Sequence, residues 1–174
     1  MTSVEDWPPA PALRSERLSL EPLRVDHAGE MAPLLADARL YEFTGGEPPT
    51  AEQLAASYRR RVSADGSDGR RWCNWLRRSR ASGTAIGGMQ AYVARGEDGF
   101  VADLAWIVGC EHQGLGYARE AAAAVVAWLR RQGEVVLIAE IHERHEASVR
   151  VARALGLAPT DEAAEHEGDV RWRG

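Results

Sequence analysis

The chain has 174 residues, a length that favours a single domain, and its 45% of apolar residues are enough for a packed core. The net charge of −5, without a basic tail or repeat, argues against a nucleic-acid carrier, and no apolar run approaches the roughly 20 residues of a membrane span. All 21 basic residues are arginines, so chemistry that needs a lysine, such as Schiff-base formation or a Walker loop, is excluded.

The N-terminal segment, residues 1–12, contains three prolines and has neither the early positive charge nor the apolar centre of a signal peptide. We therefore predict a flexible Pro-rich tail over 1–12 and one domain over 13–174. Cys73 and Cys110 lie far apart in apolar contexts, which favours free thiols over a disulfide and favours a cytoplasmic location.

The sequence pattern of the first half of the chain predicts antiparallel strands and two helices. Asp26 is a candidate N-cap for a helix that reaches Leu35, and Thr50 with Gln53 forms a capping box before a second helix. We expect strands at 17–24, 72–78, 84–93 and 100–108, with turns at 65–69, 79–83 and 96–99.

The second half alternates between helical and strand patterns. Apolar residues from Ala118 to Leu129 lie on one helical face, and Gly133 ends that helix. We expect a strand covered on both faces at 135–139, a helix at 146–155 and a late strand at 170–172. Strand, helix, strand implies a right-handed crossover and local parallel pairing, so the fold class is α+β, a mixed α/β sheet flanked by helices.

A glycine-containing loop, residues 113–118, lies between a predicted strand and the start of a helix. The first amides of a helix lack partners within it, the helix dipole places partial positive charge there, and glycines let the backbone approach a ligand closely. Gly114, Gly116 and Ala118 therefore form a candidate binding site for a diphosphate. The alternative is an ordinary tight turn that contains glycine. The loop is neither a dinucleotide fingerprint nor a Walker loop.

Residues 113–118 resemble the Gln/Arg-x-x-Gly-x-Gly/Ala signature of the GNAT superfamily of N-acetyltransferases. Residues 114–121 are similar to the form found in the Rim-type branch, which includes enzymes that acetylate ribosomal-protein N-termini. The segments 15–23 and 147–157 are similar to that branch's opening strand and to its Ser-x-Arg-helix-Leu-Gly-Phe segment. These three matches occur in family order over residues 15–157.

The resemblance implies acetyl-CoA as the co-substrate and a sheet splayed at its centre, with the pantetheine arm between the strands 100–108 and 135–142. Backbone at Ile107 and Val108 would pair with the pantetheine amides, and the Val108 amide would polarise the thioester carbonyl. The residues implied to hold the pyrophosphate are Gln113, Gly114, Leu115, Gly116, Tyr117 and Ala118. Arg119 replaces a small hydroxyl residue and is either an additional phosphate contact or a solvated helix residue.

The implied chemistry is direct attack of a neutral primary amine on the thioester in a ternary complex, since neither cysteine has a partner pattern that suggests an acyl-enzyme. Ser148 aligns with the family serine that can protonate the leaving sulfur. Its alternative role is a helix N-terminal residue that bonds a backbone amide. His145 stands where the family often has a cofactor-bonding asparagine, and a histidine's charge depends on pH.

The sequence does not single out one residue as the general base. Asp103 lies on a strand where related sequences often carry glutamate, and partial burial would raise its pKa. It could equally be a strand-edge charge, and its rivals are Glu111, His112 and His142.

The implied acceptor is a protein N-terminus or a small-molecule amine. Specificity for it would reside in residues 43–71 and in those after Gly156, where no motif is present. The alternative function is a non-catalytic acyl-CoA-binding or sensor domain, which only the histidine at position 145 favours. No His/Cys cluster has metal-ligand spacing, so we predict no metal. Homodimers are common on this fold, and the sequence leaves the oligomeric state open.

Overall fold

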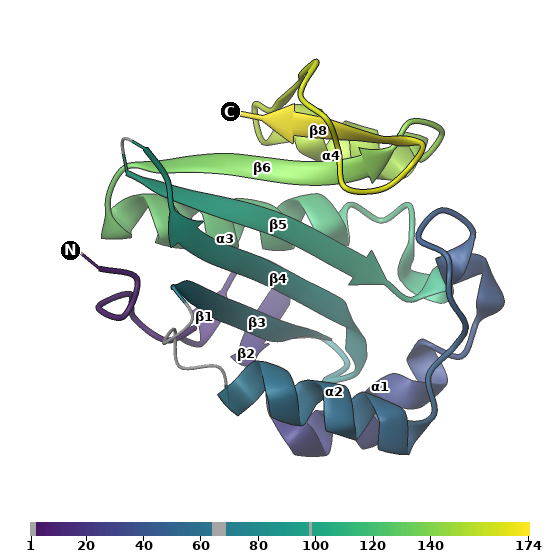
Figure 1. The fold of residues 1–174 in the computed structure, drawn as a ribbon. Coiled ribbons are helices and arrows are strands. Elements are labelled where there is room, and N and C mark those ends of the chain that lie inside the picture. Colours follow the sequence, from purple (N-terminus) through teal and green to yellow (C-terminus); the bar gives the residue numbers. More distant parts are fainter. Residues whose placement is uncertain (1–2, 64–68, 98) are drawn as a thin grey trace.

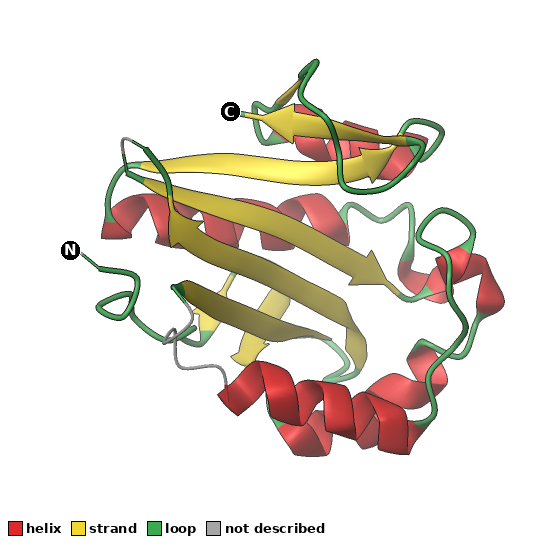
Figure 2. Cartoon of the chain, viewed as in Figure 1, coloured by secondary structure: helices red, strands yellow, loops and turns green. Residues whose placement is uncertain are grey.

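The computed structural model describes residues 3–63, 69–97 and 99–174, and it shows a twisted sheet with helices on both faces (Figures 1 and 2). The strands are β1 Leu13–Arg14, β2 Leu18–Pro22, β3 Arg70–Ser79, β4 Ala85–Arg95, β5 Phe100–Val108, β6 Val135–His142, β7 Ala158–Pro159 and β8 Asp169–Arg173. The helices are η1 Val25–His27, α1 Ala28–Leu34, η2 Ala38–Tyr41, α2 Ala51–Ser63, η3 Cys110–His112, α3 Tyr117–Gln132 and α4 Glu146–Ala154.

The strands form one sheet in the order β1-β2-β3-β4-β5-β6-β8-β7. Neighbouring strands of the described chain are antiparallel except β5 and β6, which are parallel and joined by the α3 crossover. The predicted mixed sheet and the predicted order of elements are confirmed. Of the predicted turns, those at 65–69 and 96–99 include residues 65–68 and residue 98, which lie outside the described residues.

The sheet splays between its two parallel strands, as the resemblance implied. β5 and β6 pair over Phe100–Asp103 and Val135–Ile138 and no further, and Figure 1 shows them diverging beyond that point. From Ile138 to His142 the other edge of β6 is paired with β8. Among the described residues, the edge of β5 after Asp103 therefore has no strand partner on the β6 side.

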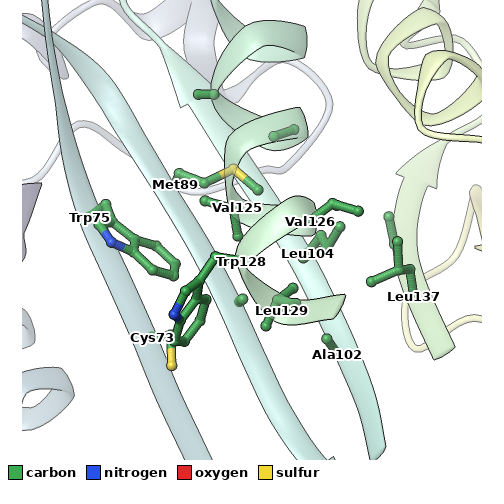
Figure 3. Packing of buried hydrophobic residues seen from close by; sticks show 14 of the residues in the cluster. Cys73, Trp75, Met89, Ala102, Leu104, Val125, Val126, Trp128, Leu129 and Leu137 are labelled. Atoms are coloured by element: carbon green, nitrogen blue, oxygen red, sulfur yellow. The ribbon is translucent and has the colours of Figure 1, made fainter. Parts of the chain in front are cut away.

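One face of the sheet packs against α3. Figure 3 shows Trp128 and Leu129 of this helix directed at sheet residues that include Trp75 and Leu104. The strand β6 was predicted to be covered on both faces, which is wrong: Leu137 is fully buried, whereas Ile138 is half-buried. The reason is that α3 covers one face, while α1 and α2 pack on the opposite face over β3 and β4 rather than over β6.

The N-terminal segment is packed over its described part, which corrects the expectation of a flexible tail. Val4 and Trp7 are 4% and 1% exposed. The Trp7 ring lies edge-on to Phe100, with ring centroids 4.8 Å apart. The Trp75 indole N–H donates to the Pro11 carbonyl at 2.7 Å. Burying an indole among aromatic rings offsets the entropy of ordering this segment.

The start of the first helical region also differs from the prediction. Asp26 does not cap it; its carboxylate pairs with the Arg24 side chain. His27 is 1% exposed, and its Nδ1 accepts from the Arg24 amide at 3.2 Å. The capping box of Thr50 and Gln53 is confirmed, since each side chain accepts from the other's backbone amide.

Candidate active site

The loop before α3 has the geometry of an anion-binding site. Gly114 and Gly116 have φ of 74° and 80°, in the left-handed region that favours glycine. Gly116 is the N-cap of α3 and offers no side chain to the first amides of the helix. Leu115 is 53% exposed, so this loop is open to solvent. Amides at the positive end of a 16-residue helix, with no competing cap from Gly116, fit a diphosphate.

An arginine from the opening strand segment fixes this loop. The Arg17 Nη1 donates to the Leu115 carbonyl at 2.9 Å, and its guanidinium lies 4.7 Å from the Tyr117 ring centroid. Glu120 accepts from the Arg17 amide and Nε, both at 2.7 Å, and from the Ser15 hydroxyl at 2.6 Å. Sequence reasoning did not find this role for Arg17, although it singled out the segment that contains Arg17. Arg119 is exposed on the first turn of α3.

The edge of β5 presents Val108, rather than Ile107, to the gap between β5 and β6. The Gly109 amide donates to the Ile86 carbonyl of β4 at 3.0 Å. In an antiparallel pair, peptide groups face the partner strand at every second residue, so Ile107 also faces β4 and Val108 faces away. Consistent with this, the Val108 carbonyl accepts from the Gln113 side-chain amide at 3.0 Å. The backbone groups available to a ligand in the gap are therefore those of Val108 and, by the same alternation, Trp106.

The Ser148 hydroxyl lies at the start of α4 between two ring N–H groups. The Trp106 Nε1 is 3.2 Å from the Ser148 Oγ, and the His145 Nε2 is 3.4 Å from it. The His145 Nδ1 accepts from the Ser148 amide at 3.3 Å, so His145, not Ser148, is the N-cap of α4. An Nδ1 that accepts places the ring proton of a neutral imidazole on Nε2, and burial lowers the pKa of His145.

This arrangement determines where the serine proton can go. With the imidazole proton on Nε2, the Ser148 oxygen accepts from the ring N–H groups of both Trp106 and His145. The hydroxyl proton is then free to be donated to a third group. Phe43, from the segment between η2 and α2, lies tilted against the His145 ring, with ring centroids 4.6 Å apart.

Asp103 is the last residue of β5 that pairs with β6, opposite Ile138, and so stands at the point of splay. Burial first, and then the negative charges of Glu140 and Glu165, raise its pKa to about 6, while Arg171 acts in the opposite direction. Alternate strand residues point to opposite faces. The side chain of Asp103 therefore lies on the face opposite to Trp106, which packs with the α3 core.

The rival bases lie elsewhere. Glu111 and His112 belong to η3, beyond the end of β5, where they line a cleft of about 580 Å³ with α1 and the β3–β4 turn. His142 ends β6 and stacks against Phe43, with ring centroids 5.4 Å apart. Of the four candidates, Asp103 is therefore the one at the splay point.

A family model described as "Acetyltransferase (GNAT) domain" matches residues 17–158. No curated protein sequence matches the chain. Among solved structures, an acetyltransferase from Agrobacterium tumefaciens str. C58 is 24% identical with a TM-score of 0.73, and the match covers 97% of this chain and 96% of that chain.

Two further solved structures were determined with CoA ligands. RimL, a ribosomal L7/L12 alpha-N-protein acetyltransferase in complex with coenzyme A, is 14% identical with a TM-score of 0.75, over 94% of this chain and 97% of that one. The microcin C7 self immunity acetyltransferase MccE, in complex with acetyl-CoA and AMP, is 10% identical with a TM-score of 0.76, over 92% and 93%. With a family model that spans most of the chain and a splayed sheet that bears the glycine loop, the chain belongs to the GNAT family of N-acetyltransferases, whose co-substrate is acetyl-CoA.

Proposed function

We propose that the protein transfers the acetyl group of acetyl-CoA directly to a primary amine within a ternary complex. The observation that carries this proposal is the placement of two complementary groups about the splay of β5 and β6. Asp103, a carboxyl with a raised pKa, faces one side of the sheet, and Ser148, a hydroxyl with its proton free, approaches Trp106 from the other. Direct transfer needs a proton acceptor on the side of the incoming amine and a proton donor beside the leaving sulfur.

The co-substrate is proposed to lie along the exposed edge of β5. The amides of 115–118 would hold the pyrophosphate at the positive end of α3. The peptide groups of Trp106 and Val108, which face the gap, would pair with the pantetheine arm as a strand does. We propose that the thioester lies beside the N–H of Val108, which is suited to donate a hydrogen bond to the carbonyl oxygen as negative charge develops there.

The chemistry then balances with these residues alone. Asp103 takes the proton of the ammonium, and the amine lone pair forms the new C–N bond while the carbonyl electron pair moves onto oxygen. Return of that pair breaks the C–S bond, and the thiolate takes the proton of Ser148. The nitrogen, which still carries one proton more than an amide, gives that proton back to the Ser148 oxygen. Asp103 then releases its proton to solvent, so one proton leaves per turnover. A raised pKa of about 6 suits Asp103 to act as a base near neutral pH. Neither cysteine takes part, since Cys73 is fully buried on β3 and Cys110 lies beyond β5 in η3.

The face that carries Asp103 has the character of an amine site. Tyr92 pairs directly with Asp103 across the sheet, and Trp72 lies on the other side of Tyr92 with ring centroids 4.6 Å apart. Ala105, two residues further on the same face, is exposed. An acidic group next to aromatic rings is suited to a cationic amine. RimL acts on a protein N-terminus, and MccE is a self-immunity enzyme, so we propose either a protein N-terminus or a small-molecule amine as the acceptor.

The alternative, a non-catalytic acyl-CoA sensor, drew its support from the histidine at position 145. In the structure this residue caps α4 and contacts the Ser148 hydroxyl, so it contributes to an arrangement suited to proton donation. We therefore favour the enzyme. Both cysteines are free thiols, which supports our proposal of a cytoplasmic location.

The test is release of CoA thiol from acetyl-CoA with a panel of N-terminal peptides, polyamines, amino acids and antibiotic amines. We expect turnover with at least one class, and initial-rate lines that intersect as a ternary complex requires. Asp103→Asn should abolish turnover, whereas Asp161→Asn, in an exposed turn, should not change it. Acetyl-CoA binding without turnover of any amine would favour the sensor, and parallel initial-rate lines would refute direct transfer.

A further inference from the structure

Arg77 is the most unusual charged residue of the described chain. It lies in β3, its side chain is 0% exposed, and burial lowers its pKa to about 9, so it stays charged at neutral pH. Its Nη2 donates to the carbonyl of Ile107, while its Nε and Nη1 have no hydrogen-bond partner among the described residues. A buried cation without a carboxylate destabilises a fold. Its presence at this position therefore suggests a function that offsets the cost.

The neighbouring strand opens the path for this side chain. Gly87 of β4 pairs with Arg77 on one side and with Val108 of β5 on the other. A Cβ on Gly87 would collide with the Ile107 carbonyl oxygen and would lie 2.7 Å from the Arg77 Nη2, so no side chain fits at this position. The absence of a side chain on Gly87 thus lets the guanidinium cross β4 and reach β5.

The carbonyl that Arg77 contacts belongs to the same peptide group as the Val108 N–H. All described peptide bonds are trans, so within this group the C=O and the N–H point in opposite directions. The C=O of Ile107 faces β4 and Arg77, and the N–H of Val108 faces the gap between β5 and β6. A positive charge is therefore connected to the gap through a single peptide group.

We propose that Arg77 is a positioning residue that polarises this peptide, so that the Val108 N–H becomes a stronger donor to the thioester carbonyl oxygen. A cationic donor on a carbonyl draws electron density from the amide nitrogen, and hydrogen bonds in series strengthen one another. The effect is largest where water is excluded, as it is around a fully buried guanidinium. The inference rests on the proposed function, since it names what strengthens the group that stabilises charge in that reaction.

Substitution of Arg77 by methionine tests the proposal, because methionine fills a similar length without a charge. Loss of a complete oxyanion donor costs about 10²–10³ in kcat. Arg77→Met should weaken a donor without removing it, so we expect a loss of about tenfold in kcat, with the KM for acetyl-CoA unchanged. Because an unpaired buried cation is removed, the melting temperature should be unchanged or higher.

The matched control is Arg78→Met. Arg78 is adjacent on β3 but is paired with Glu21 and Glu30. Its removal should lower the melting temperature and leave kcat unchanged. Arg77→Met should lower kcat but not the melting temperature, and Arg78→Met should do the reverse. This contrast would distinguish polarisation of the Ile107–Val108 peptide from a general loss of packing.

A second readout needs no turnover. The infrared stretch of carbonyl-labelled ¹³C-acetyl-CoA, bound without an amine, should lie at higher frequency in Arg77→Met than in the natural protein or in Arg78→Met. If Arg77→Met does not fold, Arg77→Gln is measured in the same way, with the same expectation. An unchanged carbonyl frequency in the folded variant would overturn the inference even if the enzyme turns over. A frequency shift without turnover of any amine would leave the inference standing and refute the proposed function.

Discussion

Removal of the Ser148 hydroxyl distinguishes a role of this residue in catalysis from a role in helix capping. In the structure the Ser148 amide is bonded by the His145 Nδ1, so Ser148→Ala leaves the cap of α4 in place. What is lost are two half-buried contacts of the hydroxyl oxygen, at 3.2 Å to the Trp106 indole and at 3.4 Å to His145, together worth about 1–2 kcal/mol. A missing general acid costs about 10²–10⁴ in rate, and a thiolate is a good leaving group, so we expect the lower end. A loss of about 100-fold in kcat corresponds to about 2.7 kcal/mol.

The assay is thiol release at saturating acetyl-CoA and amine, together with thermal unfolding of the same variant. The KM for acetyl-CoA should change little, because the proposed pyrophosphate and pantetheine contacts are made by backbone groups and not by this hydroxyl. Ser148→Thr, which keeps the hydroxyl, should recover most of kcat. A fall in melting temperature with kcat within about twofold of the natural protein would refute the assignment of Ser148 as the proton donor.

Three further predictions concern the base and the phosphate loop. The rate kcat/KM should fall below pH of about 6 as Asp103 becomes protonated, and this limb should be absent in Asp103→Asn. Because the folded pKa of Asp103 lies above its unfolded value, its contribution to stability is present below the unfolded pKa and is lost as pH rises toward 6. Asp103→Asn should therefore raise the melting temperature at pH 7 more than at pH 4, and an equal change at both would contradict its burial. Gly116→Ala should weaken acetyl-CoA binding, measured by calorimetry, because a left-handed φ costs an L-residue about 1–2 kcal/mol; Gly29→Ala, with open space around its Cβ, is the control and should bind normally. Arg17→Gln should weaken acetyl-CoA binding several-fold, through loss of the contacts to Leu115 and Glu120, and unchanged affinity would remove this residue from the site.

Local patterns predicted most of the fold. The strand Phe100–Val108 was predicted at its observed bounds, and α3 begins after Gly116 and ends before Gly133, as glycine and helical periodicity indicated. The N-terminal tail was mispredicted because its order depends on Trp7, whose partners Phe100 and Trp128 are distant in sequence. Three prolines suggested a tail, and no local signal predicts that an indole will find a distant pocket.

Motifs in the sequence name some of the candidate site residues, whereas those whose placement depends on strand register have no local signal. The glycine loop, Asp103 and Ser148 were identified from the sequence. The orientation of Ile107 toward β4 was not, because alternation in a sheet is set by pairing with another strand. Arg77 was missed for the same reason: its sequence context resembles a solvated arginine run, and its burial depends on the opposing Gly87. The role of His145 as the N-cap of α4 is likewise visible in the structure and not in the sequence.

The most direct test of the account is a crystal structure of the protein with acetyl-CoA. The account predicts the pyrophosphate on the amides of 115–118, the thioester carbonyl oxygen within hydrogen-bond distance of the Val108 N–H, and the sulfur facing the Ser148 hydroxyl. It also predicts that the side chain of Asp103 borders the opening from which an amine would approach the carbonyl carbon. A thioester held away from β5, or a sulfur with no line of approach to Ser148, would contradict it.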